Sequence, residues 1–159
     1  MSSIVSLMEE YLKTIAAEFT AKLEDALQRG RIDIDALFDE NYVKTEEENK
    51  FKNRSNKFFD TEILPLLKQW IKKDSHLIYV VAMDKNGYMP THITPTRAYI
   101  KMSDQVSMSG AKTPYLLRQP FRRPKEVGGE LVKDVAMPIM VRNRHWGCLR
   151  IGYIQNAGA

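Results

Sequence analysis

Two charged side chains, Arg118 and Asp134, interrupt segments that are otherwise apolar and have the composition of β-strands. A charge that points inward from a sheet costs free energy unless it is paired. One interpretation is that the two residues form an ion pair with each other or with the helices. The other is that they bind a small charged ligand, with Tyr79 and Tyr115 as candidate walls of the pocket.

His92 follows a hairpin signal, because the preceding "DKNG" supplies residues that tolerate positive φ angles. A tight turn sets the register of its strands, so we expect the position of His92 on the returning strand to be fixed. Its imidazole either hydrogen-bonds nearby backbone or contacts a ligand. No second histidine at ligand spacing and no acidic cluster accompanies it, so no metal site is expected. No cofactor is expected either, and b-type haem with His92 as axial ligand is the alternative.

Cys148 is the one cysteine of the chain, which excludes an internal disulfide and a site with several cysteine ligands. It alternates with apolar residues in "HWGCLRIGY", so we interpret it as a buried structural thiol. In a strand, Cys148 and His145 point to opposite faces and form no catalytic dyad. We therefore expect no catalytic residue and no enzyme, with a small enzyme as the less favoured alternative.

The composition is that of an ordinary globular domain. The chain has 159 residues, of which 43% are hydrophobic and 28% charged, and no apolar run is long enough to span a membrane. The net charge of +4 is small, and the basic excess lies late in the chain. We interpret that excess as a solvated loop face and expect no nucleic-acid partner. The residues concerned are Arg118, Arg122, Arg123, Lys125, Arg142, Arg144 and Arg150.

The first half of the sequence has helical periodicity. Apolar residues recur every three or four positions over Ile4–Leu27, and Gly30 suits a left-handed cap. A second helix should run to about Ile71, with a kink or restart at Pro65. The stripe of the first helix, which includes Ile15 and Phe19, exceeds what a small sheet can cover. It predicts contact with another helix, either from an adjacent segment or from a second copy, and we expect a homodimer through the N-terminal helix.

The second half has the pattern of strands. Residues 1–73 are predicted to be a helical segment for signalling and dimerisation, and residues 74–159 a sensor sheet, together one structural domain. "PFRRPKEVGGE" is interpreted as a turn-rich loop. The fold class is therefore α+β, with long N-terminal helices followed by an antiparallel sheet of five strands. The expected strands are "HLIYVVAM", "YMPTH", "TPYLLRQPF", "ELVKDVAMPIMV" and "HWGCLRIGY".

Four ordered segments, "MDKNGYMPTH", "PYLLRQPFRR", "VKDVAMPIMV" and "RHWGCLRIGY", resemble the PAS/Cache-like sensory domain of bacterial methyl-accepting chemotaxis proteins. The resemblance covers nearly the whole chain. It implies a PAS/Cache-like sheet that binds a small polar or anionic molecule and signals through its helices. Sensors of this kind often bind amino and organic acids, which implies that Arg118 and Asp134 receive the carboxylate and ammonium groups of such a ligand. The candidate ligand site consists of Tyr79, His92, Tyr115, Arg118 and Asp134. A haem- or other cofactor-binding PAS-like sensor is the alternative.

Two departures from the family pattern bear on the ligand. Ile93 stands where the family usually has asparagine, and the crossover over residues 94–113 is shortened. Because crossover residues line the pocket in such sensors, the identity of the ligand does not follow from the resemblance. The lone thiol and the absence of a signal peptide favour the cytoplasm. An extracytoplasmic sensor domain is the alternative, attached to the membrane only by receptor segments outside this chain.

Overall fold

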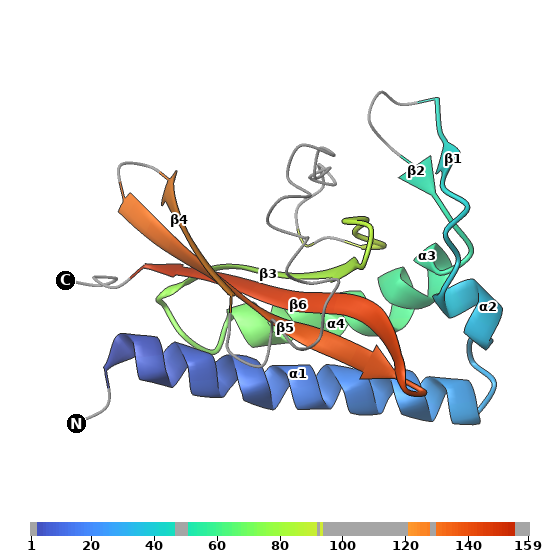
Figure 1. Cartoon of the computed structure of the whole chain (residues 1–159), viewed down its shortest axis with the longest axis horizontal. Helices are drawn as coiled ribbons and strands as arrows, with labels where there is room; N and C mark the ends of the chain where they lie inside the picture. Colours follow the sequence, from blue (N-terminus) through green and yellow to red (C-terminus); the bar gives the residue numbers. More distant parts are fainter. Residues whose placement is uncertain (1–2, 47–50, 92, 94–120, 128–129, 155–159) are drawn as a thin grey trace.

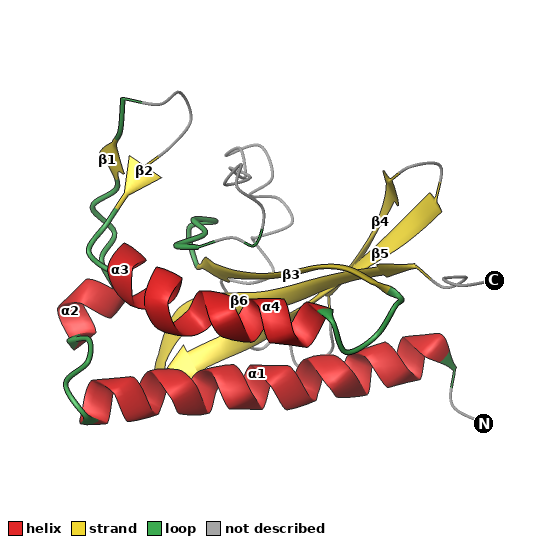
Figure 2. Ribbon diagram, turned by 180° about the vertical axis from the view of Figure 1, so that it is seen from behind, coloured by secondary structure: helices red, strands yellow, loops and turns green. Residues whose placement is uncertain are grey.

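The computed structural model describes residues 3–46, 51–91, 93, 121–127 and 130–154. In this part of the chain, a four-stranded antiparallel sheet packs one face against two helices (Figure 1). Figure 2 shows the two helices side by side over that face. The strands in sheet order are β3 (Leu77–Asp84), β6 (Arg144–Ile154), β5 (Glu130–Val141) and β4 (Phe121–Val127). The helices are α1 (Ile4–Gln28) and α4 (Leu64–Ile71).

Helix α1 has the bounds expected from its periodicity. Its first turn is capped by Ser3, whose hydroxyl oxygen accepts the N–H of Ser6 at 3.1 Å. The chain leaves the helix through Gly30 at φ +72°, a left-handed conformation that glycine adopts without strain. The predicted cap is therefore confirmed. Ile15 and Phe19 face the sheet and are almost completely buried.

The second helical segment restarts where Pro65 predicts. It consists of α3 (Asn56–Phe58), a π-helical turn η1 (Phe59–Ile63) and α4. Pro65 lies in the first turn of α4, where its missing N–H leaves no hydrogen bond unmade. The predicted end at Ile71 is confirmed.

A small hairpin lies between the helical segments. α2 (Ile34–Leu37) is capped by Asp33, whose carboxylate accepts the N–H of Ala36 at 2.7 Å. Strands β1 (Val43–Lys44) and β2 (Phe51–Lys52) follow and pair antiparallel. This stretch has the composition of a polar link, so its pairing was not predicted. In Figure 1 the hairpin extends beyond the end of the large sheet.

Strands β5 and β6 match their predicted bounds closely and form a hairpin. Its two-residue connection is Arg142 and Asn143, at φ 51° and 61°. Two successive positive φ angles are the signature of a type I′ turn, whose twist suits paired strands.

The prediction of a five-stranded sheet is wrong for the described residues, whose larger sheet has four strands. Within the part of the chain that the structure describes, residues 88–91, expected to start a return strand, pair with no strand, and β6 is the one strand paired with β3. Side chains from the helical segment bind this stretch instead: Asn56 Nδ2 donates to the carbonyl of Pro90 at 2.8 Å, and Thr91 donates to Asp60 at 2.6 Å. The expected strand "TPYLLRQPF" lies, apart from Phe121, outside the described residues.

Strand β4 corrects a second expectation. The segment interpreted as a loop, "FRRPKEV", pairs in register with β5 from Phe121 opposite Ala136 to Val127 opposite Glu130. It is the last strand in the sheet order, and proline is tolerated at an edge because its missing N–H need not interrupt the pairing. Pro124 and the two arginines gave this segment the composition of a loop, and the sequence pattern therefore did not reveal the strand.

One hydrophobic core lies between the helices and the sheet and draws on both the 1–73 and 74–159 segments. At its centre the Trp146 ring stacks on Phe59 at 5.4 Å and meets the edge of Phe19 at 5.5 Å. Trp146 therefore packs between the sheet and the helices. The largest fully buried side chains of this core also include Tyr153, Leu12, Leu23, Ile63 and Leu67.

Candidate functional site

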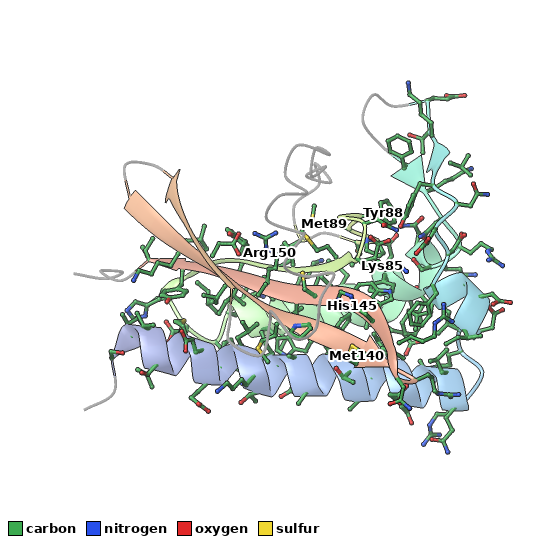
Figure 3. The ribbon with its side chains drawn as sticks, in the orientation of Figure 1. Lys85, Tyr88, Met89, Met140, His145 and Arg150 are labelled. Carbon is green, nitrogen blue, oxygen red and sulfur yellow. The ribbon has the colours of Figure 1, made fainter. Side chains whose placement is uncertain are left out.

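The sheet face away from the helices carries a buried charge. Along β6 successive side chains alternate, so Leu149 and Ile151 enter the core under the helices while Arg150 points to the other face. Figure 3 shows Arg150 and Met89 on the side of the sheet away from α1. Arg150 is only 4% exposed. A guanidinium this deeply buried needs a partner of opposite charge.

Asp134 of β5 is that partner. Arg150 Nε donates to Asp134 Oδ1 at 3.1 Å, and Arg150 Nη2 donates to Asp134 Oδ2. The sheet register explains the contact, because Asp134 lies opposite Gly152 and therefore diagonal to Arg150. Burial disfavours the charged guanidinium, but the attraction and hydrogen bonds of Asp134 outweigh burial and raise the pKa of Arg150 above its ordinary value. The pair is a bidentate ion pair in a low-dielectric setting.

Tyr79 lies beside this pair on the same face. Its ring crosses the backbone of Gly152, and a Cβ at Gly152 would lie 2.1 Å from Tyr79 Cε2. Glycine is therefore required at this position for the ring to lie flat on β6. The ring is half-buried and stands next to Arg150.

Apolar and sulfur-containing side chains surround the ion pair. Arg150 Nη1 lies 3.8 Å from Met83 Sδ, and Cys148 is fully buried two positions along β6. Burial raises the pKa of the Cys148 thiol to about 12, which leaves no thiolate to act as a nucleophile at neutral pH. The interpretation of Cys148 as a buried thiol is confirmed. The apolar cluster on this face consists of Val81, Met83, Met89, Ala136 and Cys148.

The structure brings together two of the five predicted site residues. Tyr79 and Asp134 share the face away from the helices, whereas His92, Tyr115 and Arg118 lie outside the described residues. The described partner of Asp134 is Arg150, which had been assigned to a solvated basic face; that assignment is wrong. A signal existed, since Arg150 interrupts an apolar strand just as Asp134 does.

A second buried carboxyl ends β3. Asp84 is 8% exposed and accepts a hydrogen bond from the hydroxyl of Tyr42 at 2.5 Å. Its other oxygen accepts the backbone N–H groups of Asn86 and Tyr88, each at 2.9 Å. Burial raises the pKa of Asp84 to about 6 in spite of these donors. Sequence reasoning treated this aspartate only as a turn residue.

The described residues contain no group of three or more histidine, cysteine or acidic side chains placed to hold a metal ion. Among the same residues, no helix combines the length and the apolar character of a membrane span. Comparison of the chain with family models, with curated proteins and with solved structures gave no match. The candidate site therefore has to be interpreted from its own geometry.

Proposed function

We propose that this chain is the sensory domain of a methyl-accepting chemotaxis receptor. It binds a small polar or anionic molecule on the sheet face that carries Arg150 and Asp134, and it catalyses no reaction. The observation that carries the proposal is the buried ion pair itself. Such pairs add little net stability, because apolar side chains of similar volume often serve as well or better. A binding role gives a reason for the charge at this position, and the sequence resemblance points the same way.

The recognition chemistry follows from the residue types. Asp134 occupies the Nε–Nη2 edge of the Arg150 guanidinium and fixes its orientation, so we propose that a polar or anionic ligand binds through the remaining N–H groups. Tyr79, which is half-buried, adds an aromatic surface beside it, and the fully buried Met83 and Cys148 make the surroundings of the guanidinium apolar. An apolar surface with a few oriented polar groups is typical of small-molecule sites.

We infer that helix α1 receives the conformational change that ligand binding causes in the sheet. It packs against β5 and β6, the two strands that supply Asp134 and Arg150. Leu149 and Ile151, which flank Arg150, are core residues on the helix side. A ligand that repositions β6 therefore acts directly on the packing of α1. Coupling free energies between such states are about 1–3 kcal/mol.

Self-association through α1 belongs to this proposal, as does a cytoplasmic location. The face that pairs cannot be the one with Ile15 and Phe19, because both pack under the sheet of their own chain. The outer face carries Leu7, which is 52% exposed. Sedimentation of the wild type and of Leu7→Glu tests the dimer: we expect a wild-type dimer at high micromolar concentration and a weaker one in the variant. A wild-type monomer would remove the dimer from the proposal.

A thermal-shift screen against amino acids, organic acids and purines tests the sensory function. A compound present at about 100 times its Kd stabilises the folded state by about 2.7 kcal/mol, which raises Tm by about 5–11 °C for a chain of this size. We expect one class of anionic compound to reach this range. If no compound raises Tm by more than 1 °C or so, the proposal fails. A Soret band in the purified protein would favour the haem alternative instead.

The same screen locates the site through an apolar replacement of the ion pair. The double variant Asp134→Leu with Arg150→Met removes both charges, and we expect it to stay folded and to lose the shift. Arg29→Met is the matched control, because Arg29 forms an exposed ion pair with Asp25 at 2.8 Å on the surface. The control should keep the full shift.

A further inference from the structure

The turn after β3 contains the one Asn–Gly pair of the sequence, Asn86 and Gly87, and these two residue types can react with each other. Glycine has no Cβ, so its backbone nitrogen is unusually open to a neighbouring group. That nitrogen can attack Cγ of the preceding asparagine and form a five-membered succinimide. The proton of the glycine N–H leaves with the side-chain nitrogen as ammonia, and water then opens the ring to aspartate or isoaspartate.

In the folded chain, hydrogen bonds hold both reacting groups. The N–H of Gly87 donates to the carbonyl of Asp84 at 3.0 Å, so removal of its proton breaks a bond of the turn. Asn86 Nδ2, the leaving nitrogen, donates to the hydroxyl oxygen of Tyr42 at 3.0 Å. The backbone N–H of Asn86 donates to Asp84 Oδ1 at 2.9 Å and so fixes the main chain as well. Ring closure therefore has to break contacts that the native turn makes.

The amide of Asn86 cannot become a carboxylate without loss. The hydroxyl of Tyr42 has a single hydrogen, which it donates to Asp84 Oδ2 at 2.5 Å. Its oxygen accepts a hydrogen in turn, and Asn86 Nδ2 supplies it. A carboxylate at position 86 has no hydrogen to donate, so two carboxylates would compete for one hydroxyl hydrogen. Asp84 is only 8% exposed, and a second negative charge beside it is unfavourable.

The neighbouring charges do not compensate for a new carboxylate. Glu40 already acts on Asp84 through its negative charge. Lys85 pairs with Glu40, with 2.9 Å between Nζ and the carboxylate oxygen. Conversion of Asn86 would add a further carboxylate to this group, and the single ammonium of Lys85 cannot balance all of them.

We propose that Asn86–Gly87 is a site of spontaneous deamidation, which the folded turn restrains and whose product weakens the contact between this turn and Tyr42. The inference does not rest on the proposed ligand site, because the reaction needs only water. Other contacts between the same segments remain, since the hydroxyl of Tyr88 donates to the carbonyl of Phe51 at 3.1 Å (Figure 3). The product is therefore a folded chain of lower stability.

Peptide mapping by mass spectrometry measures the conversion at neutral pH, because the peptide that carries residues 86–87 gains the mass difference between an amide and a carboxyl group. The native protein is compared with the same protein unfolded in guanidinium chloride. Since only the opened turn reacts in the native state, we expect its rate to be lower by at least about tenfold, equivalent to about 1.4 kcal/mol of local opening. Equal rates in the two states, or no conversion of the unfolded chain, would overturn the restrained site.

Asn86→Asp places the carboxylate of the product in the turn directly. We expect the folding equilibrium constant, measured by urea unfolding, to fall by about tenfold or more, because the change removes a hydrogen bond and adds a charge beside a buried carboxyl group. Asn143→Asp is the matched control, since it makes the same chemical change in the exposed turn between β5 and β6. The control should change the constant by no more than about threefold.

Tyr42→Phe identifies the contact responsible for the loss. Without the hydroxyl, Asn86→Asp removes no hydrogen bond to Tyr42, so it should reduce the folding constant by a smaller factor in the Tyr42→Phe background than in the wild type. An Asn86→Asp variant as stable as the wild type, or the same factor in both backgrounds, would contradict the proposed effect of the product. If Asn86→Asp does not fold, the deamidated fraction of aged wild-type protein is measured instead; it should unfold at a lower urea concentration, and an unchanged midpoint would count equally against the proposal.

Discussion

Removal of Asp134 should destabilise the fold strongly. In Asp134→Ala the guanidinium of Arg150, which is 4% exposed, keeps its charge and loses a bidentate partner. A buried charge left without its partner costs about 3–5 kcal/mol. For a domain of this size that cost lowers Tm by about 6–20 °C.

A double-mutant cycle separates the ion pair from general damage to the core. Asp134→Ala, Arg150→Met and the double variant are unfolded in urea, and the fluorescence of the buried Trp70 and Trp146 follows the transition. Because the double variant leaves no uncompensated charge, its loss of stability should be smaller than the sum of the single losses by at least about 1 kcal/mol. Additive losses, or a cost under about 1 kcal/mol in both single variants, would refute the geometry of the pair.

Three further outcomes follow from the packing. Gly152→Ala should cost about 1–3 kcal/mol in urea unfolding because the Tyr79 ring occupies the space of the new methyl group, and adding Tyr79→Ala should recover part of that loss; no recovery would contradict the contact. Ile15→Lys with Phe19→Lys should abolish the folded circular dichroism signal rather than merely separate a dimer, since both side chains are core residues; a folded monomer would contradict their burial. Cys148 should react with iodoacetamide at neutral pH only in denaturant, and fast labelling of the native protein would contradict its burial.

Much of the fold could be predicted because local patterns and tertiary packing agree. The stripe of α1 is continuous, Gly30 takes the left-handed conformation expected of it, and Pro65 falls where a helix restarts. Strands β5 and β6 are long enough for their apolar alternation to be unambiguous. In these elements no distant residue overrides the local preference.

The failed predictions involve segments whose structure depends on distant partners. "YMPTH" has the composition of a strand, but Asn56 binds Pro90 and so draws the chain toward α3. "FRRPKEV" has turn chemistry, yet β5 offers it a backbone ladder at the sheet edge. Neither partner is visible in a short sequence window.

Half of the ion pair was predicted, and the other half was missed for a physical reason. Asp134 was identified because it interrupts an apolar strand. Arg150 was grouped with other basic residues because it lies late in the chain. It is, however, two positions from both Cys148 and Gly152 and so lies on the same face of β6 as they do. Register along the strand, rather than charge density, is what distinguishes a buried arginine from a solvated one.

The site is tested most directly by a calorimetric titration of the wild type with the compound that gives the largest thermal shift. The same titration is run on Arg29→Met and on the double variant Asp134→Leu with Arg150→Met. We expect saturable binding with equal affinity to the wild type and to Arg29→Met, and binding at least about tenfold weaker, equivalent to 1.4 kcal/mol, to the double variant. Equal affinity of a folded double variant would contradict a ligand site at Arg150 and Asp134.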